Sequence, residues 1–226
     1  MSNFDVSPHE ASKHLTRKQR AISCGEICLA MLIIVAHNVY HWIPNEVPIL
    51  FVLAIASFRM REGNWGWHLY KRPASWALAL LLAVLCVVLL QVKDMIFEPI
   101  AHYFGAPPRV SSILTRVHDV HRALQTVLFV WVFAAFGEEI GYRGYIQRRA
   151  LDVFGRNAWG VTVALVIASA AFGFGHFYKG GAGMLESTGS GLILGSAYLL
   201  SGRLWAGTIA HGVNDTLAVV FSYFGW

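Results

Sequence analysis

The segment that decides the fold reads ALQTVLFVWVFAAF at residues 123–136 and continues directly as GEEIGYRG at residues 137–144. The apolar run is too short to cross a bilayer alone, so a spanning helix must continue through Glu138 and Glu139. Each charged side chain at membrane depth disfavours insertion by roughly 2.5–3.5 kcal/mol, and such residues persist mainly where they are paired and face a cavity. The two carboxylates therefore indicate a functional site inside a membrane domain.

The composition supports a membrane protein, since the 226 residues are 56% hydrophobic and only 14% charged. About 20 residues of helix cross a hydrocarbon core of ~30 Å. Besides the segment above, a shorter apolar stretch at residues 47–58 needs residues from 42 onward to span. Five more stretches are apolar with few or no charges: 21–40, 73–90, 158–177, 187–201 and 204–226. We therefore expect an all-α, polytopic transmembrane bundle of about seven helices.

The chain is expected to form one membrane domain. We predict a polar, basic cytoplasmic tail at residues 1–20 and a single transmembrane helical domain at 21–226, with the catalytic helices within 121–226. The main interruption is expected at 98–120, because this stretch contains four helix breakers: Pro99, Gly105, Pro107 and Pro108.

The formal net charge of +5 reflects membrane topology rather than nucleic-acid binding. With the N-terminus in the cytoplasm, 13 of the 18 lysines and arginines fall in inside segments, which is the asymmetry that sets orientation. We predict a cytoplasmic N-terminus and no nucleic-acid partner. The short loops and apolar chain favour an integral protein of a bacterial inner membrane, with lipids as neighbours.

Glu139 and Arg143 are four residues apart, so on a helix they share a face and can form an ion pair. Glu138 then points about 100° away. In a purely structural interpretation, both glutamates neutralise Arg143 and fix helix packing. In a functional one, Arg143 keeps Glu139 ionised while an apolar cavity raises the pKa of Glu138 and makes it a general base.

Two histidines lie deep in other apolar segments. His176 ends the stretch FGFGH, and His211 precedes Asn214 and Asp215 in the last segment. Asp215 can accept a hydrogen bond from the His211 imidazole and fix its tautomer. A lone histidine in a membrane helix is more often a packing residue, but the presence of the two glutamates makes a catalytic role of these histidines the better interpretation. The helical rise places Glu138 and His211 at similar depth and His176 nearer the outer side.

These stretches resemble the motifs of the CPBP family of intramembrane proteases, also called the CAAX-protease and bacteriocin-processing or Abi family. The family motifs are E-E-x-x-x-R, F-x-x-x-H and H-x-x-x-N/D. Here they read EEIGYR at 138–143, FGFGH at 172–176 and HGVND at 211–215, in the same order and in separate apolar segments. The resemblance implies a CAAX-protease-like helical fold and an intramembrane endopeptidase.

The resemblance further implies that Glu138 activates water together with His176, while His211 and position 215 polarise the carbonyl and stabilise the oxyanion. The family often has Asn at the last position, whereas this chain has Asp215. Asp215 is then expected to orient His211 or to be protonated, and Asn214 could take part of its role.

Members of the family have been described both as metalloproteases and as glutamic proteases. A zinc ion could be held by His176, His211 and Glu138, with an open position for water. A metal-free site needs only Glu138 as base and histidine assistance. The catalytic residues are scattered over three helices without an H-E-x-x-H core, which slightly favours the metal-free interpretation.

Two alternatives belong to other classes. A haem-binding bundle could use some of the ten histidines, among them His37, His41, His118 and His121, but His37, His41 and His118 fall near the predicted outer interface. A non-catalytic scaffold or an ion- or proton-coupled transporter could use Glu138, Glu139 and Arg143 as a relay. The sequence does not select a substrate beyond a membrane-associated, lipophilic or lipidated peptide or protein.

Overall fold

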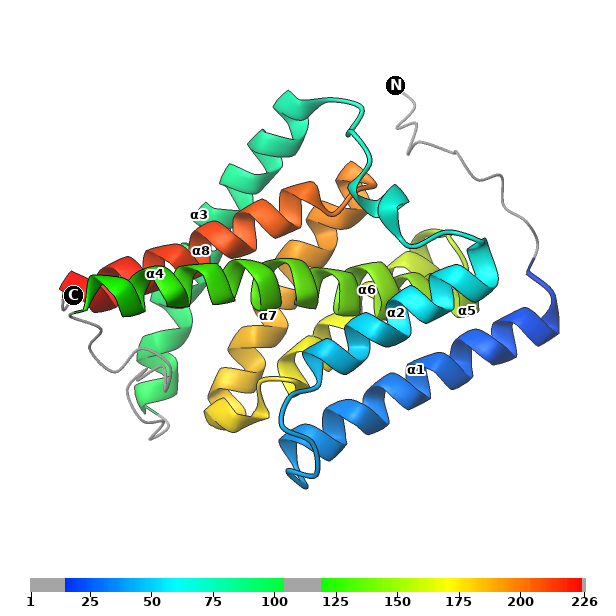
Figure 1. Ribbon diagram of the computed structural model, residues 1–226, viewed down its shortest axis with the longest axis horizontal. Helices are drawn as coiled ribbons and strands as arrows, with labels where there is room; N and C mark the ends of the chain where they lie inside the picture. The colour runs from blue at the N-terminus through cyan, green and yellow to red at the C-terminus, as the bar shows by residue number, and fades with distance from the viewer. Residues whose placement is uncertain (1–14, 104–118, 225–226) are drawn as a thin grey trace.

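The computed structural model describes residues 15–103 and 119–224, and within these ranges the chain is helical and contains no strand (Figure 1). The helices are α1 (Arg17–Asn38), α2 (Val47–Glu62), α3 (Trp76–Tyr103), α4 (Val120–Phe129), η2 (Val130–Gln147), α5 (Arg148–Phe154), α6 (Ala158–Phe174), α7 (Gly180–Ser201) and α8 (Trp205–Phe224), with short 3-10 turns η1 (Trp67–Tyr70) and η3 (Phe177–Lys179). Because α4, η2 and α5 form one continuous helix, the described ranges contain seven helices. This confirms the predicted all-α bundle of about seven.

Three of these helices are long and apolar enough to cross a membrane: Arg17–Asn38, Trp76–Phe97 and Val120–Phe154. The pair α6 and α7 counts as a fourth if it is one broken span, bent by 60°. The expectation that every helix spans is therefore not met by length and composition. Helix α2 has only 16 residues, and α8 carries three polar side chains in its middle: His211, Asn214 and Asp215.

Large apolar side chains are exposed along the candidate spans, as on α3, where Leu81, Val84 and Val88 face outward. A soluble domain of this size does not leave such a surface uncovered, because exposed apolar area favours association with lipid or another protein. The surface of α3 therefore fits a helix that faces acyl chains, in agreement with an integral membrane protein.

Two predicted boundaries differ from the structure. The interruption expected from residue 98 begins later, since α3 continues through Pro99 to Tyr103. A proline removes one backbone hydrogen bond, and near a helix end this loss is tolerated. Most of that predicted interruption lies outside the described residues. Helix α7 begins at Gly180 rather than at residue 187.

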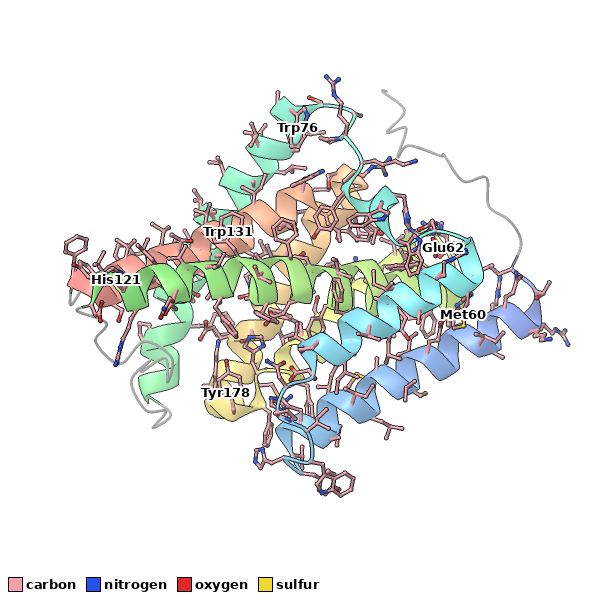
Figure 2. All side chains as sticks on the ribbon, viewed as in Figure 1. Met60, Glu62, Trp76, His121, Trp131 and Tyr178 are labelled. Atoms are coloured by element: carbon pink, nitrogen blue, oxygen red, sulfur yellow. The ribbon has the colours of Figure 1, made fainter. Side chains whose placement is uncertain are left out.

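Small residues let the helices approach closely around the segment that contains Glu138 and Glu139. A Cβ atom added at Gly191 of α7 would lie 2.8 Å from the Ser169 Cα of α6. At Gly212 of α8 it would lie 2.7 Å from the Trp131 ring of η2, which is labelled in Figure 2. Trp131 Nε1 also donates a hydrogen bond to Thr216 Oγ1, at 3.1 Å. Close backbone contact of this kind stabilises helix pairs in lipid, where the hydrophobic effect between helices is weak.

A network of ion pairs ties α1, α2 and α5 together at the ends that the charge pattern predicts to be cytoplasmic. Arg149 pairs with Glu26 at 3.2 Å, with Glu62 at 3.1 Å and with Asp152 at 2.9 Å. Arg61 joins the same group through Glu26 and Asp152. The arginines in this network are thus neutralised by carboxylates from three helices.

We expect Gly191→Ala to destabilise the protein by about 1–3 kcal/mol, because the new methyl group would press on the backbone of α6 and overpack the interface. Thermal unfolding of the detergent-solubilised protein would measure the change. Gly181→Ala is the matched control, since nothing lies within 4 Å of a Cβ added there. Equal unfolding temperatures for the two variants would contradict close α6–α7 packing.

Candidate active site

The innermost part of the site is a buried ion pair within the η2 helix. Arg143 Nη1 lies 2.9 Å from Glu139 Oε1, and the two side chains are 1% and 0% exposed. The predicted pairing at four-residue spacing is therefore present. Gly207 of α8 leaves the room that the carboxylate occupies, since a Cβ atom there would lie 2.7 Å from Glu139 Oε2.

His211 of α8 links this ion pair to the other carboxylates. Its Nδ1 donates to Glu139 Oε1 at 3.2 Å. Its Nε2 then faces Glu138 Oε2 at 3.8 Å and Asp215 Oδ2 at 3.7 Å. Because Glu139 fixes the Nδ1 side of the imidazole, any proton on Nε2 is shared with the two outer carboxylates. The structure thus brings the first and third motifs together.

Exposure increases outward through this cluster. The side chain of Glu139 is 0% exposed, His211 9%, Glu138 14% and Asp215 27%. The Oε2 atoms of Glu138 and Glu139 are both buried without a hydrogen bond to the described residues, but only Glu138 has an exposed part of its side chain. A buried carboxylate oxygen costs free energy unless it finds a partner, which here can be water or a bound peptide. Glu138 is therefore the acidic group of the pair that is open to a reactant.

His176 lies at the break between α6 and α7, where α6 ends at Phe174. Its Nδ1 donates to the Phe172 carbonyl oxygen at 2.8 Å, so the Nε2 atom carries a lone pair in the neutral ring. The His176 ring lies beside Phe172, as the four-residue spacing predicts, and the chain bends by 60° at this break.

Phe172 occupies the centre of the site and contacts residues of all three motifs. Its ring centroid lies 4.7 Å from that of His176 and 6.0 Å from that of His211. The Arg143 guanidinium carbon lies 4.3 Å from the same ring centroid, a cation–π contact. Phe172 therefore separates the two imidazoles and covers the buried guanidinium with an apolar face.

Asn214 points away from this cluster. Its Oδ1 accepts a hydrogen bond from Gln91 Nε2 of α3 at 2.9 Å, and its Nδ2 donates to Asp215 Oδ1 at 3.5 Å. The geometry links Asn214 to α3 and to the Asp215 carboxylate. Asp215, in contrast, lies on the His211 side, as the four-residue spacing predicts.

Sequence reasoning missed a second polar group next to the site. The Tyr142 hydroxyl donates to Glu46 Oε1 at 3.3 Å, and Glu46 Oε2 lies 3.2 Å from His37 Nε2. Burial raises the pKa of the Glu46 carboxyl, and the His37 imidazole partly offsets this effect. A Cβ atom at Gly175 would meet the Tyr142 hydroxyl, so this group supports the turn that carries His176. The only sequence signals were the position of Tyr142 inside the first motif and an acidic residue in a short loop.

The donors of the site are not gathered around a single point in the arrangement seen here. Within residues 15–103 and 119–224, no three histidine, cysteine or carboxylate side chains converge on a shared point that could hold a metal. The Nδ1 atoms of His211 and His176 donate to Glu139 and to a backbone carbonyl. Zinc-binding histidines use the same support, and it leaves Nε2 as the possible ligand atom of each ring. A zinc ion held by His176, His211 and Glu138 stays a prediction.

The fold and the site together define a polytopic membrane protein with a buried glutamate–histidine centre built from three separate helices. Residues 121–217 match the family model described as Type II CAAX prenyl endopeptidase Rce1-like. The matched range contains all three motifs and confirms the resemblance to the CAAX-protease family. Within this range the chain is similar to a family of proteases. No curated protein and no solved structure matches the chain.

We expect Arg143→Gln to destabilise the protein by about 3–5 kcal/mol, because it leaves the Glu139 carboxylate buried beside an uncharged partner. The double change Glu139→Gln with Arg143→Gln should cost less than the sum of the two single changes, and chemical unfolding of all three variants measures this coupling. Arg156→Gln, an exposed site, serves as the control and should change stability by less than about 0.5 kcal/mol. Additive costs would show that the ion pair does not contribute as a unit.

Proposed function

We propose that the protein is an intramembrane endopeptidase that hydrolyses a peptide bond of a membrane-associated or lipophilic peptide or protein. One observation supports this proposal above the others. Glu138 is 14% exposed and its Oε2 atom lies 3.8 Å from His211, whereas Glu139 is 0% exposed and pairs through Oε1 with both Arg143 and His211. Two neighbouring carboxylates with such different surroundings are typical of a site in which one is structural and the other reacts.

In the proposed first step, a water molecule binds between Glu138 and the Nε2 lone pair of His176. Glu138 takes a proton from this water, and the water oxygen attacks the scissile carbonyl carbon. The new carbon–oxygen bond yields a tetrahedral oxyanion. His176 needs no protonation change for this role, because its Nδ1–H is already directed to the Phe172 carbonyl. General-base assistance of this kind contributes typically 10²–10⁴-fold.

The oxyanion is stabilised in this proposal by a proton on His211 Nε2. Glu139 accepts the hydrogen bond from Nδ1 and orients the ring, and Asp215 lies 3.7 Å from Nε2 on the outer side. Asp215 is thus assigned to orienting His211, while Asn214 holds Asp215 from the α3 side. The carbon–nitrogen bond then breaks as Glu138 returns its proton to the leaving amine, so the step balances without another reactant.

The proposal includes a location and an orientation. A bacterial inner membrane with the N-terminus in the cytoplasm is supported by the distribution of lysine and arginine. The ion-pair network of Arg61 and Arg149 joins α1, α2 and α5 at the ends assigned to the cytoplasmic side. The substrate would enter from the membrane, as expected for a lipidated or otherwise apolar peptide.

Glu138→Gln is expected to lower cleavage by at least about 10²-fold while leaving the fold intact, because the amide cannot accept a proton from water. Peptides from membranes that contain the wild-type protein or the variant would be compared by mass spectrometry. A peptide processed only by the wild type then becomes the substrate for measurements with purified protein in liposomes.

The matched control for this change is Asp119→Asn, also a carboxylate-to-amide replacement, at the N-cap of α4. Asn is as good an N-cap as Asp, so this variant should fold and cleave normally. Cleavage that survives Glu138→Gln, Glu139→Gln and His176→Ala would overturn the peptidase proposal. Ion or proton flux without cleavage would favour the transporter alternative.

Cleavage by the purified protein is expected to persist after treatment with a strong zinc chelator, because Glu138 and the histidines perform the proposed steps. Elemental analysis of the same sample reports bound metal independently of activity. Loss of cleavage that zinc alone restores, together with about one zinc per chain, would assign the reaction to a metal centre instead.

A further inference from the structure

A second feature lies beside the η2 helix, at the residue that follows Glu139. A cavity of about 260 Å³ is enclosed by α2, the turn that follows it, η1 and one residue of η2. Its lining is almost entirely apolar, with Ile55 and Phe58 on α2, Trp65 and Trp67 at the rim and Ile140 on the catalytic helix. The proposed peptidase reaction uses none of these side chains.

The rim of this cavity has the composition of a membrane–water interface. Trp65 and Trp67 are 54% and 74% exposed, although both are large aromatic residues. Tryptophan concentrates where the acyl chains meet the headgroups, because its ring is apolar and its N–H is polar. In Figure 2, Met60 and Glu62 mark the end of α2 that leads into this turn. The cavity therefore opens at headgroup depth.

Cations flank the cavity on both sides in the chain. Arg59 directly follows the lining residue Phe58, and Lys71 and Arg72 directly follow the lining residue Tyr70. All three cations are exposed, and none has a carboxylate within ion-pair distance in the part of the chain that is described. The Arg59 guanidinium lies 5.6 Å from the Trp65 ring centroid. It thus lies at the mouth of the cavity.

Neighbouring arginines differ from these cations, because they are paired with carboxylates. Arg61, Arg148 and Arg149 lie on the same end of the bundle, and each is paired with a carboxylate of the network described above. Arg59 at the cavity mouth, and Lys71 and Arg72 directly after Tyr70, have no such carboxylate neighbour in the described residues. Their charge is therefore available to an anion from outside the protein.

We propose that this cavity binds one acyl chain of an anionic membrane phospholipid, with its headgroup phosphate held by Arg59 and Lys71. An apolar cavity with a cationic mouth at headgroup depth matches a molecule that has an apolar chain and a negative head. The bound chain would contact Ile140, the residue after Glu139, and would therefore support the catalytic helix from behind. The occupant is a resident lipid, distinct from the peptide that is cleaved.

The test measures lipid binding directly and needs no peptidase substrate. The full-length protein is purified in mild detergent, and phosphatidylglycerol or phosphatidylcholine is titrated while native mass spectrometry counts the bound lipids. We expect phosphatidylglycerol to bind in preference to phosphatidylcholine. Arg59→Gln should weaken phosphatidylglycerol binding about fivefold, as for the loss of one cation near a headgroup, and leave phosphatidylcholine unchanged.

Two further variants separate the apolar and the charged parts of the site. Ile55→Trp fills the cavity and should remove the bound lipid, whereas Lys71→Gln should weaken binding from the other side of the mouth. The controls are Leu81→Trp, at an exposed apolar position on α3, and Arg17→Gln, an exposed cation on α1. Neither control should change the number of bound phosphatidylglycerol molecules.

Several results would overturn the proposal. Equal binding of the two lipids would do so, as would unchanged phosphatidylglycerol binding in both Arg59→Gln and Lys71→Gln. Displacement of the lipid by an uncharged prenyl alcohol at equal concentration would assign the cavity to a lipidated substrate instead. The charge variants decide the question even if Ile55→Trp does not fold, because they alter only exposed side chains.

Discussion

A carboxylate and a guanidinium buried in a membrane-embedded bundle can coexist only if each neutralises the other. Glu139 and Arg143 do so within one turn of the same helix, and every other part of the site is arranged around them. Because Glu139 is already paired, it can also accept a hydrogen bond from His211 and so fix the ring of a distant helix. Glu138, one residue earlier, lies outside this ion pair and is the residue proposed to react. The different surroundings of adjacent, identical side chains thus follow from a single ion pair.

Much of this arrangement could be predicted from the sequence, since it depends on local spacing. The interval from Glu139 to Arg143 and the interval from His211 to Asp215 each equal about one helical turn, and both pairs are present. The apolar segments likewise predicted the number of helices. What spacing could not provide was the break between α6 and α7 at which His176 lies, because a helical rise assumes a straight helix.

The features that sequence reasoning missed depend on contacts between distant segments. Glu46 lies in a loop near the start of the chain, and only the folded bundle places it against Tyr142 and the turn at Gly175. The cavity behind Ile140 is likewise formed by three separate elements. Neither has a periodic pattern, so neither could be read from one segment. The hydrogen bond between Asn214 and Gln91 could not be predicted either, because Gln91 comes from a distant helix.

The continuous helix from Val120 to Phe154 has 35 residues, and at about 1.5 Å per residue an α-helix of that length would extend roughly 50 Å. A hydrocarbon layer of ~30 Å cannot enclose it upright, so the helix must tilt or protrude. Tilt sets how far Glu138 lies below the surface. The acyl chain length of the surrounding bilayer would then set the depth of Glu138. A thicker hydrocarbon layer brings the helix closer to the membrane normal, and a thinner one increases its tilt.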